Sequence, residues 1–192
     1  SYLVANKAIN SFTNQEEKLF GQKWINDFDF MLEDKLAERG AKFQSSEIML
    51  SHVAIDGRLI TGQNPTSTVD VATALVESLG LTHVTVEVEL DDKTMAVIAT
   101  FLAGDKSALE TLANNQEQYL ISLVGMYGFY FLKVADTRLA FEQSLASMTV
   151  AQKAINNPNL DMEIAKTQAR LGQTANAKAT LNQLIVAKPD FE

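Results

Sequence analysis

The hydrophobic pattern of the chain changes at about residue 80. Before that point, short apolar runs rich in β-branched residues alternate with amphipathic stretches, which predicts alternating strands and helices. After it, one run of strictly alternating residues predicts a half-buried strand, and the rest of the chain has helical spacing. We expect strands over 7–12, 48–55, 58–61 and 83–90, and in the first part helices that begin at Thr13, at about Asp27 and at Ser67.

Two helix starts carry capping signals. Thr13 followed by Glu16 forms a capping box, in which the threonine accepts from the N3 backbone and the N3 glutamate reaches back to the N-cap. Ser67 followed by Asp70 resembles the same motif. Gly80 is placed to end the helix that follows Ser67.

A hairpin and a loop occupy residues 56–67. Asp56-Gly57 between two apolar runs predicts a β-hairpin with a type I′ turn, in which both central residues have positive φ. Gly62-Gln63-Asn64-Pro65 then breaks the second strand, because Pro65 cannot donate to a ladder. We therefore expect a polar loop at the carboxyl end of a buried strand, which is where ligand crevices of open α/β sheets lie.

The second part of the chain predicts helices over 95–102, 105–112, 115–134, 136–156, 160–171 and 174–187. The third of these carries an aromatic run from Tyr119 to Phe131. Aromatic residues and leucines at helical spacing indicate a packed core, and a ligand-binding box or a membrane contact is the alternative.

Composition narrows the classes of function. The chain has 192 residues, 46% hydrophobic and 21% charged, so it can build a core. Sixteen basic and 24 acidic residues give a net charge of −8, distributed over both parts of the chain. Nucleic acids and anionic membranes require a basic face, so neither is an expected partner. The longest uncharged run, 119–132, is shorter than the roughly 20 residues that span a bilayer.

The chain contains no cysteine, so disulfides and thiolate chemistry are excluded within it. No signal peptide is visible. The sequence does not decide the compartment: a cytoplasmic location is favoured, and a periplasmic one is compatible with a signal upstream of Ser1.

Three blocks resemble one known family in order and spacing. "INSFTNQEEK" at 9–18, "FMLEDKLAERGAKF" at 30–43 and "DGRLITGQNPTS" at 56–67 are similar to the C-terminal blocks of the ThiJ/PfpI superfamily, the class I glutamine-amidotransferase-like proteins. The resemblance implies an α/β fold. Residues 1–80 would be the C-terminal half of a sandwiched, flavodoxin-like parallel sheet with a β-hairpin, and residues 81–192 a mostly helical extension.

The resemblance also implies a chemistry. Members of the family act on small carbonyl compounds through a cysteine, as in glyoxalase III-like hydration of methylglyoxal or deglycation, without a cofactor, and some act in stress responses as holdases. The family's nucleophile turn with its Cys-His pair would precede Ser1. Partners would then be the missing N-terminal half of the domain, a small carbonyl substrate and, since long apolar helices suit obligate interfaces, a second copy of the chain. Catalysis by residues 1–192 alone is not expected.

Four residues are the candidate site. The resemblance places Glu17 where a carboxylate orients the histidine of a Cys-His-Glu arrangement, and Glu17 has no local partner in the sequence pattern. The alternative is a solvated acid in the first turn of a helix, which the helix dipole favours. Gly62, Asn64 and Pro65 would line the pocket mouth, or simply form a strand-to-helix turn.

The two histidines, His52 and His83, have no cysteine, serine–acid pair or second histidine beside them in the sequence, so we interpret both as polar-face strand residues. No metal site is expected for the same lack of ligands.

The last helical pair weakly resembles one tetratricopeptide unit. Leu171-Gly172 at the turn, Ala177 in the second helix and Pro189 beyond it match that pattern over 159–189, but no second copy appears. A non-enzymatic interaction or dimerisation module is therefore the rival hypothesis for the extension.

Overall fold

The structure is a computed structural model that describes residues 2–84 and 87–191. The chain divides into two compact units, Ser1–Glu87 and Val88–Glu192, which are described separately. The boundary expected from the sequence was 80/81. In the described part of the chain, no helix combines the length and the apolar character that crossing a bilayer requires.

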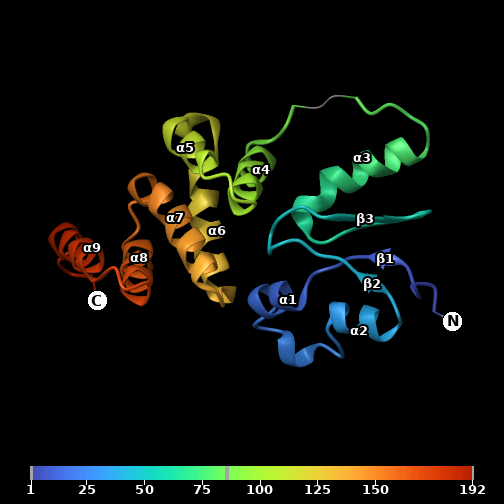
Figure 1. Cartoon of the computed structure of the whole chain (residues 1–192), viewed down its shortest axis with the longest axis horizontal. Coiled ribbons are helices and arrows are strands. Elements are labelled where there is room, and N and C mark those ends of the chain that lie inside the picture. The colour runs from blue at the N-terminus through green and yellow to red at the C-terminus, as the bar shows by residue number, and fades with distance from the viewer. Residues whose placement is uncertain (1, 85–86, 192) are drawn as a thin grey trace. The chain divides into compact units, whose positions relative to one another are not determined.

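The first unit combines short helices with two small sheets (Figure 1). Its strands are β1 (Ala8–Ile9), β2 (Lys42–Phe43), β3 (Val53–Asp56) and β4 (Leu59–Gly62), and its helices are α1 (Asn14–Phe20), α2 (Leu32–Glu38) and α3 (Thr68–Ser78). β1 pairs with β2 in parallel, and β3 pairs with β4 as an antiparallel hairpin. An α/β unit followed by a helical one is thus present, but each sheet in the described residues has two strands.

The strand expected over 48–55 begins only at Val53. The segment before it turns, because Met49 has a positive φ of 62° and its backbone N–H is drawn to the Glu16 carboxylate. Ile48 and Leu50 on either side are buried. A tertiary hydrogen bond therefore overrides the local strand propensity of this segment.

The hairpin forms, but its turn is one residue later than expected. Asp56 pairs with Leu59, so Gly57 and Arg58 are the central residues. Only Gly57 has positive φ, which fits a type II′ turn rather than type I′. Asp56 remains in the strand, where its carboxylate accepts from Lys7 Nζ at 2.7 Å and from the Ala8 backbone N–H at 3.0 Å.

Helix α2 is shorter than the helix predicted from about Asp27 to Arg39. Ile25–Asp27 is a separate 3₁₀ turn, and Phe28 and Met31 have extended backbones. Leu32 then starts α2, and its N–H donates to Glu17 Oε2 at 3.0 Å. An orphan donor at a helix N-terminus is thus satisfied from a distant carboxylate.

The capping box expected at Ser67 and Asp70 does not form. Ser67 makes no side-chain cap; its Oγ accepts from the His52 backbone N–H at 3.1 Å. Asp70 is bonded instead to the hydroxyl of Ser51. The preceding 3₁₀ turn (Pro65–Ser67) is capped by Asn64, whose side chain accepts from the Thr66 N–H.

The strand predicted over 83–90 is wrong for the described residues. His83, Val84 and 87–89 are irregular, and Leu90 begins helix α4; Thr85 and Val86 lie outside the described residues. A lone strand needs a partner to satisfy its backbone, and none of the described strands pairs with this segment.

All regular secondary structure in the described residues of the second unit is helical. Its helices are α4 (Leu90–Leu102), α5 (Ser107–Asn114), α6 (Ile121–Val134), α7 (Arg138–Ile155), α8 (Pro158–Arg170) and α9 (Thr174–Ala187), with a 3₁₀ turn at Gln116–Gln118. The most extensive packing is between α6 and α7 and between α8 and α9, and α4 and α5 pack against each other and against α6 and α7, respectively. One core cluster joins α7 and α8 and the turn after α8; it contains Phe141, Leu145, Met148, Leu160, Ile164 and Leu171.

Helices α6 and α7 approach closely because α6 has two glycines on the side that faces α7. A Cβ added at Gly128 would be 2.9 Å from the backbone N of Met148 and 2.9 Å from the carbonyl O of Ser144. At Gly125 it would be 2.8 Å from the Ala151 Cβ. The glycines cost helix propensity, about 1 kcal/mol each, and allow this contact.

The run from Tyr119 to Phe131, predicted to belong to the core, is buried on one side of the helix. Tyr127 is fully buried, Phe131 is 4% exposed, and their rings stack at 5.6 Å. Leu120 and Met126 remain exposed on the other side. At the chain's end, Gly172 turns with φ of 80° between α8 and α9, and Ala177 is buried, as the predicted helix pair requires.

Candidate functional site

The polar cluster of the first unit lies at the carboxyl ends of three strands. β1 runs parallel to β2. It also runs in the same direction as β4. The Ala8 N–H bonds to the Asp56 carboxylate, just before β4 begins, and the Asn10 N–H bonds to Thr61 Oγ1 at 3.1 Å, near the end of β4. The segments after β1, β2 and β4 therefore meet at one edge, which is the edge where α/β proteins form ligand crevices.

Glu16 is the centre of this cluster. Its carboxylate is fully buried and accepts five hydrogen bonds. Oε1 accepts from the Met49 N–H and from Asn64 Nδ2, both at 2.8 Å. Oε2 accepts from the Thr13 N–H at 3.0 Å, from Thr13 Oγ1 at 3.2 Å and from Gln63 Nε2 at 3.1 Å. The predicted capping box is confirmed, and it accounts for only part of what Glu16 does.

The loop after β4 is fixed by the side chains of Gln63 and Asn64. Gln63 is 1% exposed and joins Glu16 to the segment after β2, since its Oε1 accepts from the Ser46 N–H at 2.8 Å. Asn64 Nδ2 also donates to the Leu50 carbonyl at 2.8 Å. These bonds from two side-chain amides to a buried acid restrain the backbone of the loop, as a preorganised site requires.

Gly62 is needed at the start of this loop because of space. A Cβ there would lie 2.8 Å from Val71 Cγ2 and 2.9 Å from the Ser67 Cβ. The closeness of α3 to β4 therefore depends on a residue without a side chain. Pro65 is exposed and begins the 3₁₀ turn that leads into α3.

Glu17 does not join the cluster. It is partly exposed, and its carboxylate accepts from the Leu32 N–H. The partner of Glu17 is therefore a residue 15 positions away in sequence, which no local pattern around Glu17 indicates. Its role as a supporting acid is not decided by this contact, because one exposed hydrogen bond leaves the other oxygen open to a partner.

Sequence reasoning missed the role of Glu16, Gln63 and Met49. The capping box in the sequence correctly identified Glu16 as structural, but no signal predicts that a glutamate at N3 also bonds residues 33–48 positions away. Two buried polar atoms in the same region, Asn10 Oδ1 and His52 Nε2, have no partner among the described residues. The amide Nδ2 of Asn10 donates to the His52 carbonyl at 2.7 Å.

The chemistry of this cluster is that of an anchor. A fully buried carboxylate bonded to five neutral donors holds its neighbours in place and is not exposed to a substrate. Residues 1–192 contain no cysteine, and the described residues hold no group of three or more His, Asp or Glu side chains that could bind a metal. His83 lies apart, 3.7 Å from a Glu77 oxygen.

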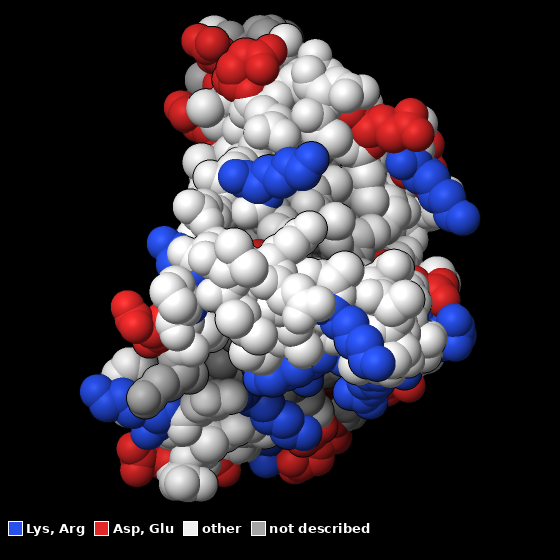
Figure 2. All heavy atoms as spheres, turned by 90° about the vertical axis from the view of Figure 1, so that its left-hand side faces the viewer, with Lys and Arg blue, Asp and Glu red and all other residues white. Residues whose placement is uncertain are grey.

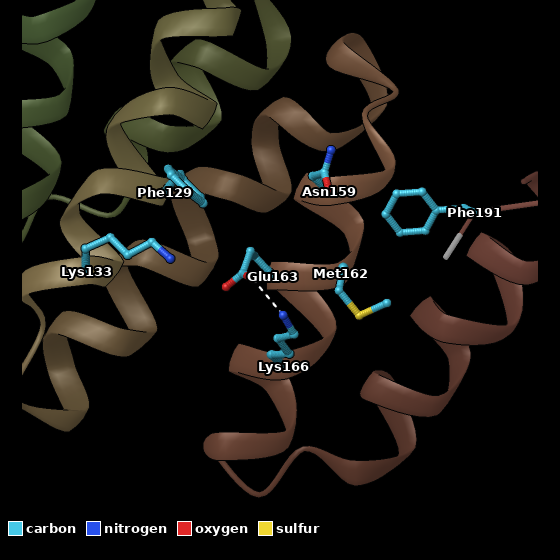
Figure 3. Close-up of a pocket in the computed structure, with 7 residues that line it drawn as sticks. All are labelled: Phe129, Lys133, Asn159, Met162, Glu163, Lys166 and Phe191. Atoms are coloured by element: carbon cyan, nitrogen blue, oxygen red, sulfur yellow. Dashed lines mark hydrogen bonds and ion pairs between the residues drawn. The ribbon is translucent and has the colours of Figure 1, made fainter. Parts of the chain in front are cut away.

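The second unit carries a cavity of about 570 Å³ beside α6 and α8 (Figure 3). Apolar and charged side chains both line it: Phe129, Lys133, Asn159, Met162, Glu163, Lys166 and Phe191. Lys133 extends from α6 toward Glu163 on α8, and Glu163 is ion-paired with Lys166 at 2.9 Å (Figure 3). A second cavity, of about 390 Å³, shares Phe191 with the first.

The surface charge is mixed. On the face of the molecule shown in Figure 2, lysine and arginine side chains are interspersed with aspartate and glutamate. The net charge of −8 therefore does not form one acidic face on this side.

Comparison with known proteins gives one partial similarity. No protein-family model and no curated protein matches the chain. The solved structure of the Rapid Encystment Protein 24 kDa (REP24) of Francisella tularensis is similar at 40% sequence identity over 40% of this chain, with a TM-score of 0.38. The present chain covers 33% of that protein's chain, so it spans about a third of the length of the structure that it resembles.

Proposed function

We propose that residues 1–80 form the C-terminal part of a ThiJ/PfpI-like α/β domain that acts on small carbonyl compounds. The observation that carries this proposal is the network around Glu16, which joins the helix after β1 to the loop after β4 at the carboxyl edge of the strands. Two of the three blocks that resemble the family, at 9–18 and 56–67, meet through these hydrogen bonds.

The small sheets support a domain that is completed by further strands. A parallel pair of two residues per strand cannot cover both of its faces, and parallel sheets in proteins are buried on both. Helix α3 has no buried residue, and Val69, Leu75 and Leu79 are 51–65% exposed. In the proposal, an N-terminal half extends β1 and β2 into a flavodoxin-like sheet and covers these side chains.

The roles of the site residues follow from this arrangement. A cysteine nucleophile and its histidine come from a segment outside these 192 residues. Glu17 orients that histidine and stabilises its imidazolium form. The backbone of Gly62, Asn64 and Pro65, held by Glu16, lines the mouth of the pocket. Methylglyoxal plus water gives lactate in such a site, with no cofactor.

The test uses the native polypeptide or complex that contains these residues and the cysteine-bearing segment. We expect it to convert methylglyoxal to lactate and Glu17→Gln to lower kcat at least tenfold with little change in melting temperature. The 192-residue chain alone should be inactive, since it has no cysteine. Absence of any cysteine-bearing partner segment, or full activity of Glu17→Gln, would contradict the proposal.

A second candidate function is protein binding by the helical unit. The cavity beside α6 and α8 favours it, because its lining includes two phenylalanines and a methionine, and aromatic and methionine side chains are enriched at protein-binding surfaces. This function concerns residues 88–192 and is independent of the chemistry proposed for the first unit. Binding measurements with purified chain, described next, test it.

A further inference from the structure

We infer that the cavity beside α6 and α8 binds an acidic peptide segment of another protein, in which a carboxylate side chain lies next to a bulky apolar one. This inference rests on the second candidate function and specifies its ligand. It is carried by the placement of Lys133, Lys166 and Glu163 among apolar walls.

Lys133 has no carboxylate partner among residues 2–84 and 87–191. Its Nζ lies 4.6 Å from the centre of the Phe129 ring, where the ring face attracts an ammonium group. Among the described residues, no carboxylate oxygen lies within 4 Å of it. A ligand carboxylate could therefore pair with Lys133 without breaking an existing ion pair.

Lys166 and Glu163 form the second part of the charge pattern. Their ion pair is local, three residues apart on α8, and 63% of the Lys166 side chain is exposed. Glu163 is 21% exposed, so the partly buried partner is the acid, and the more exposed Lys166 ammonium can donate to a second carboxylate from the solvent side. The two lysines and one glutamate among the described residues that line the cavity have a summed charge of about +1.

The whole-chain charge of −8 does not oppose this binding strongly at physiological salt. The Debye length there is about 8 Å, so charges elsewhere on the surface are screened. A ligand carboxylate inside the cavity responds mainly to the charged side chains that line it.

The shape of the surface favours a peptide. The two cavities share Phe191, and Asn159 in the first is next in sequence to Pro158 in the second. An extended segment of a few residues can lie across both, with an apolar side chain against Met162 and Phe191. Met162 is unbranched and adapts to different apolar shapes. The amide of Asn159 can bond to a peptide backbone.

The experiment titrates the purified 192-residue chain with three fluorescein-labelled octapeptides of identical apolar residues. One carries a central pair of aspartate and glutamate, one the corresponding asparagine and glutamine, and one two lysines. We expect saturable binding of the acidic peptide, with at least tenfold weaker binding of the amide peptide. Binding of the lysine peptide should be weaker still.

Variants locate the binding. Lys133→Met keeps the apolar stem and should weaken acidic-peptide binding about tenfold. Glu163→Gln removes the competing carboxylate and should strengthen it about threefold, a gain that misfolding could not produce. Lys178→Met, on the exposed part of α9 outside both cavities, is the matched control and should change nothing.

Each other outcome has a definite meaning. Equal binding of the acidic and amide peptides, lost in Met162→Ser, would overturn the acidic ligand class but keep peptide binding as a function. Equal losses in Lys133→Met and Lys178→Met, or weaker binding in Glu163→Gln, would overturn this site. Absence of saturable binding for all three peptides would overturn both this inference and the second candidate function, and would leave the enzymatic proposal untouched.

Discussion

Asn64 Nδ2 donates to Glu16 Oε1 at 2.8 Å across 48 positions of sequence. This one bond joins a helix N-terminus to the loop after a hairpin, and Glu16 also bonds the backbone of Met49. The conformation of the loop therefore depends on a residue that belongs to another block of the sequence.

Glu16→Gln should destabilise the first unit by about 2–3 kcal/mol. The glutamine NH2 group would replace one carboxylate oxygen and could not accept a hydrogen bond, so the buried donors that this oxygen binds would lose their partner. Trp24, the single tryptophan, lies in this unit, so its fluorescence during urea unfolding measures the effect. Glu17→Gln is the control: its amide oxygen can still accept from the Leu32 N–H, and the cost should stay below about 0.5 kcal/mol. Equal costs for the two variants would contradict the assignment of Glu16 as the anchor.

Asn64→Asp should destabilise the first unit more at neutral pH than at acid pH. The new carboxylate would lie beside that of Glu16, and juxtaposed like charges cost several kcal/mol, about 3 here. Protonation of the introduced aspartate removes the repulsion, so the difference from the wild type should shrink as the pH falls from 7 to 4. Asn64→Ala loses the same donor without adding charge, and its cost should be nearly independent of pH. A pH-independent cost of Asn64→Asp would contradict the contact.

The stabilising contribution of the Asp56 carboxylate to the first unit should be lost in acid. The Lys7 ammonium and the Ala8 N–H that bond its carboxylate hold the pKa of Asp56 below the usual 3.8. An acid whose pKa is lowered in the folded state stabilises the fold fully above the unfolded value, and this contribution is lost as the pH falls through the folded pKa. The carboxyl carbon chemical shift of Asp56, followed by NMR titration, measures the pKa directly.

Lys7→Met provides the comparison for Asp56. It removes the larger cause of the lowered pKa and keeps the Ala8 N–H, so the pKa of Asp56 should rise part of the way toward 3.8. An unchanged titration in Lys7→Met would show that the ion pair at 2.7 Å does not act in solution.

Gly128→Ala should destabilise the second unit although alanine is the better helix former. The gain in helix propensity is about 1 kcal/mol, whereas the new Cβ would meet backbone atoms of α7 at 2.9 Å and force the helices apart. Overpacking of this kind typically costs 1–3 kcal/mol of unfolding free energy. Because the atoms met are backbone atoms that cannot move aside, we expect a cost near the upper end and, after the gain in helix propensity, a net loss of about 2 kcal/mol. Thermal unfolding followed by far-UV circular dichroism measures it. Ser122→Ala, on the exposed side of α6, should be neutral or slightly stabilising, and a stable Gly128→Ala variant would contradict the close packing.

Local sequence signals determined most of the helices. The α9 boundaries, Thr174–Ala187, match the prediction. Helix α8 ends at Arg170, one residue before the predicted end, and α6 ends at Val134 as predicted but begins at Ile121 instead of 115. The capping box at Thr13 also formed as expected. Helices depend largely on contacts within a few residues, so periodicity, caps and glycines located these ends, whereas α2 and the start of α4 differ from the prediction.

Tertiary contacts decided the strands, the hairpin turn and the candidate site. The strand expected before Val53 is broken by the bond from Met49 to Glu16, and the alternating run that ends at Leu90 has no partner strand among the described residues. Asp56 stays in its strand because Lys7, 49 positions away, bonds to it. Strand pairing and buried polar networks join segments distant in sequence, and their free energy depends on partners that no local pattern contains.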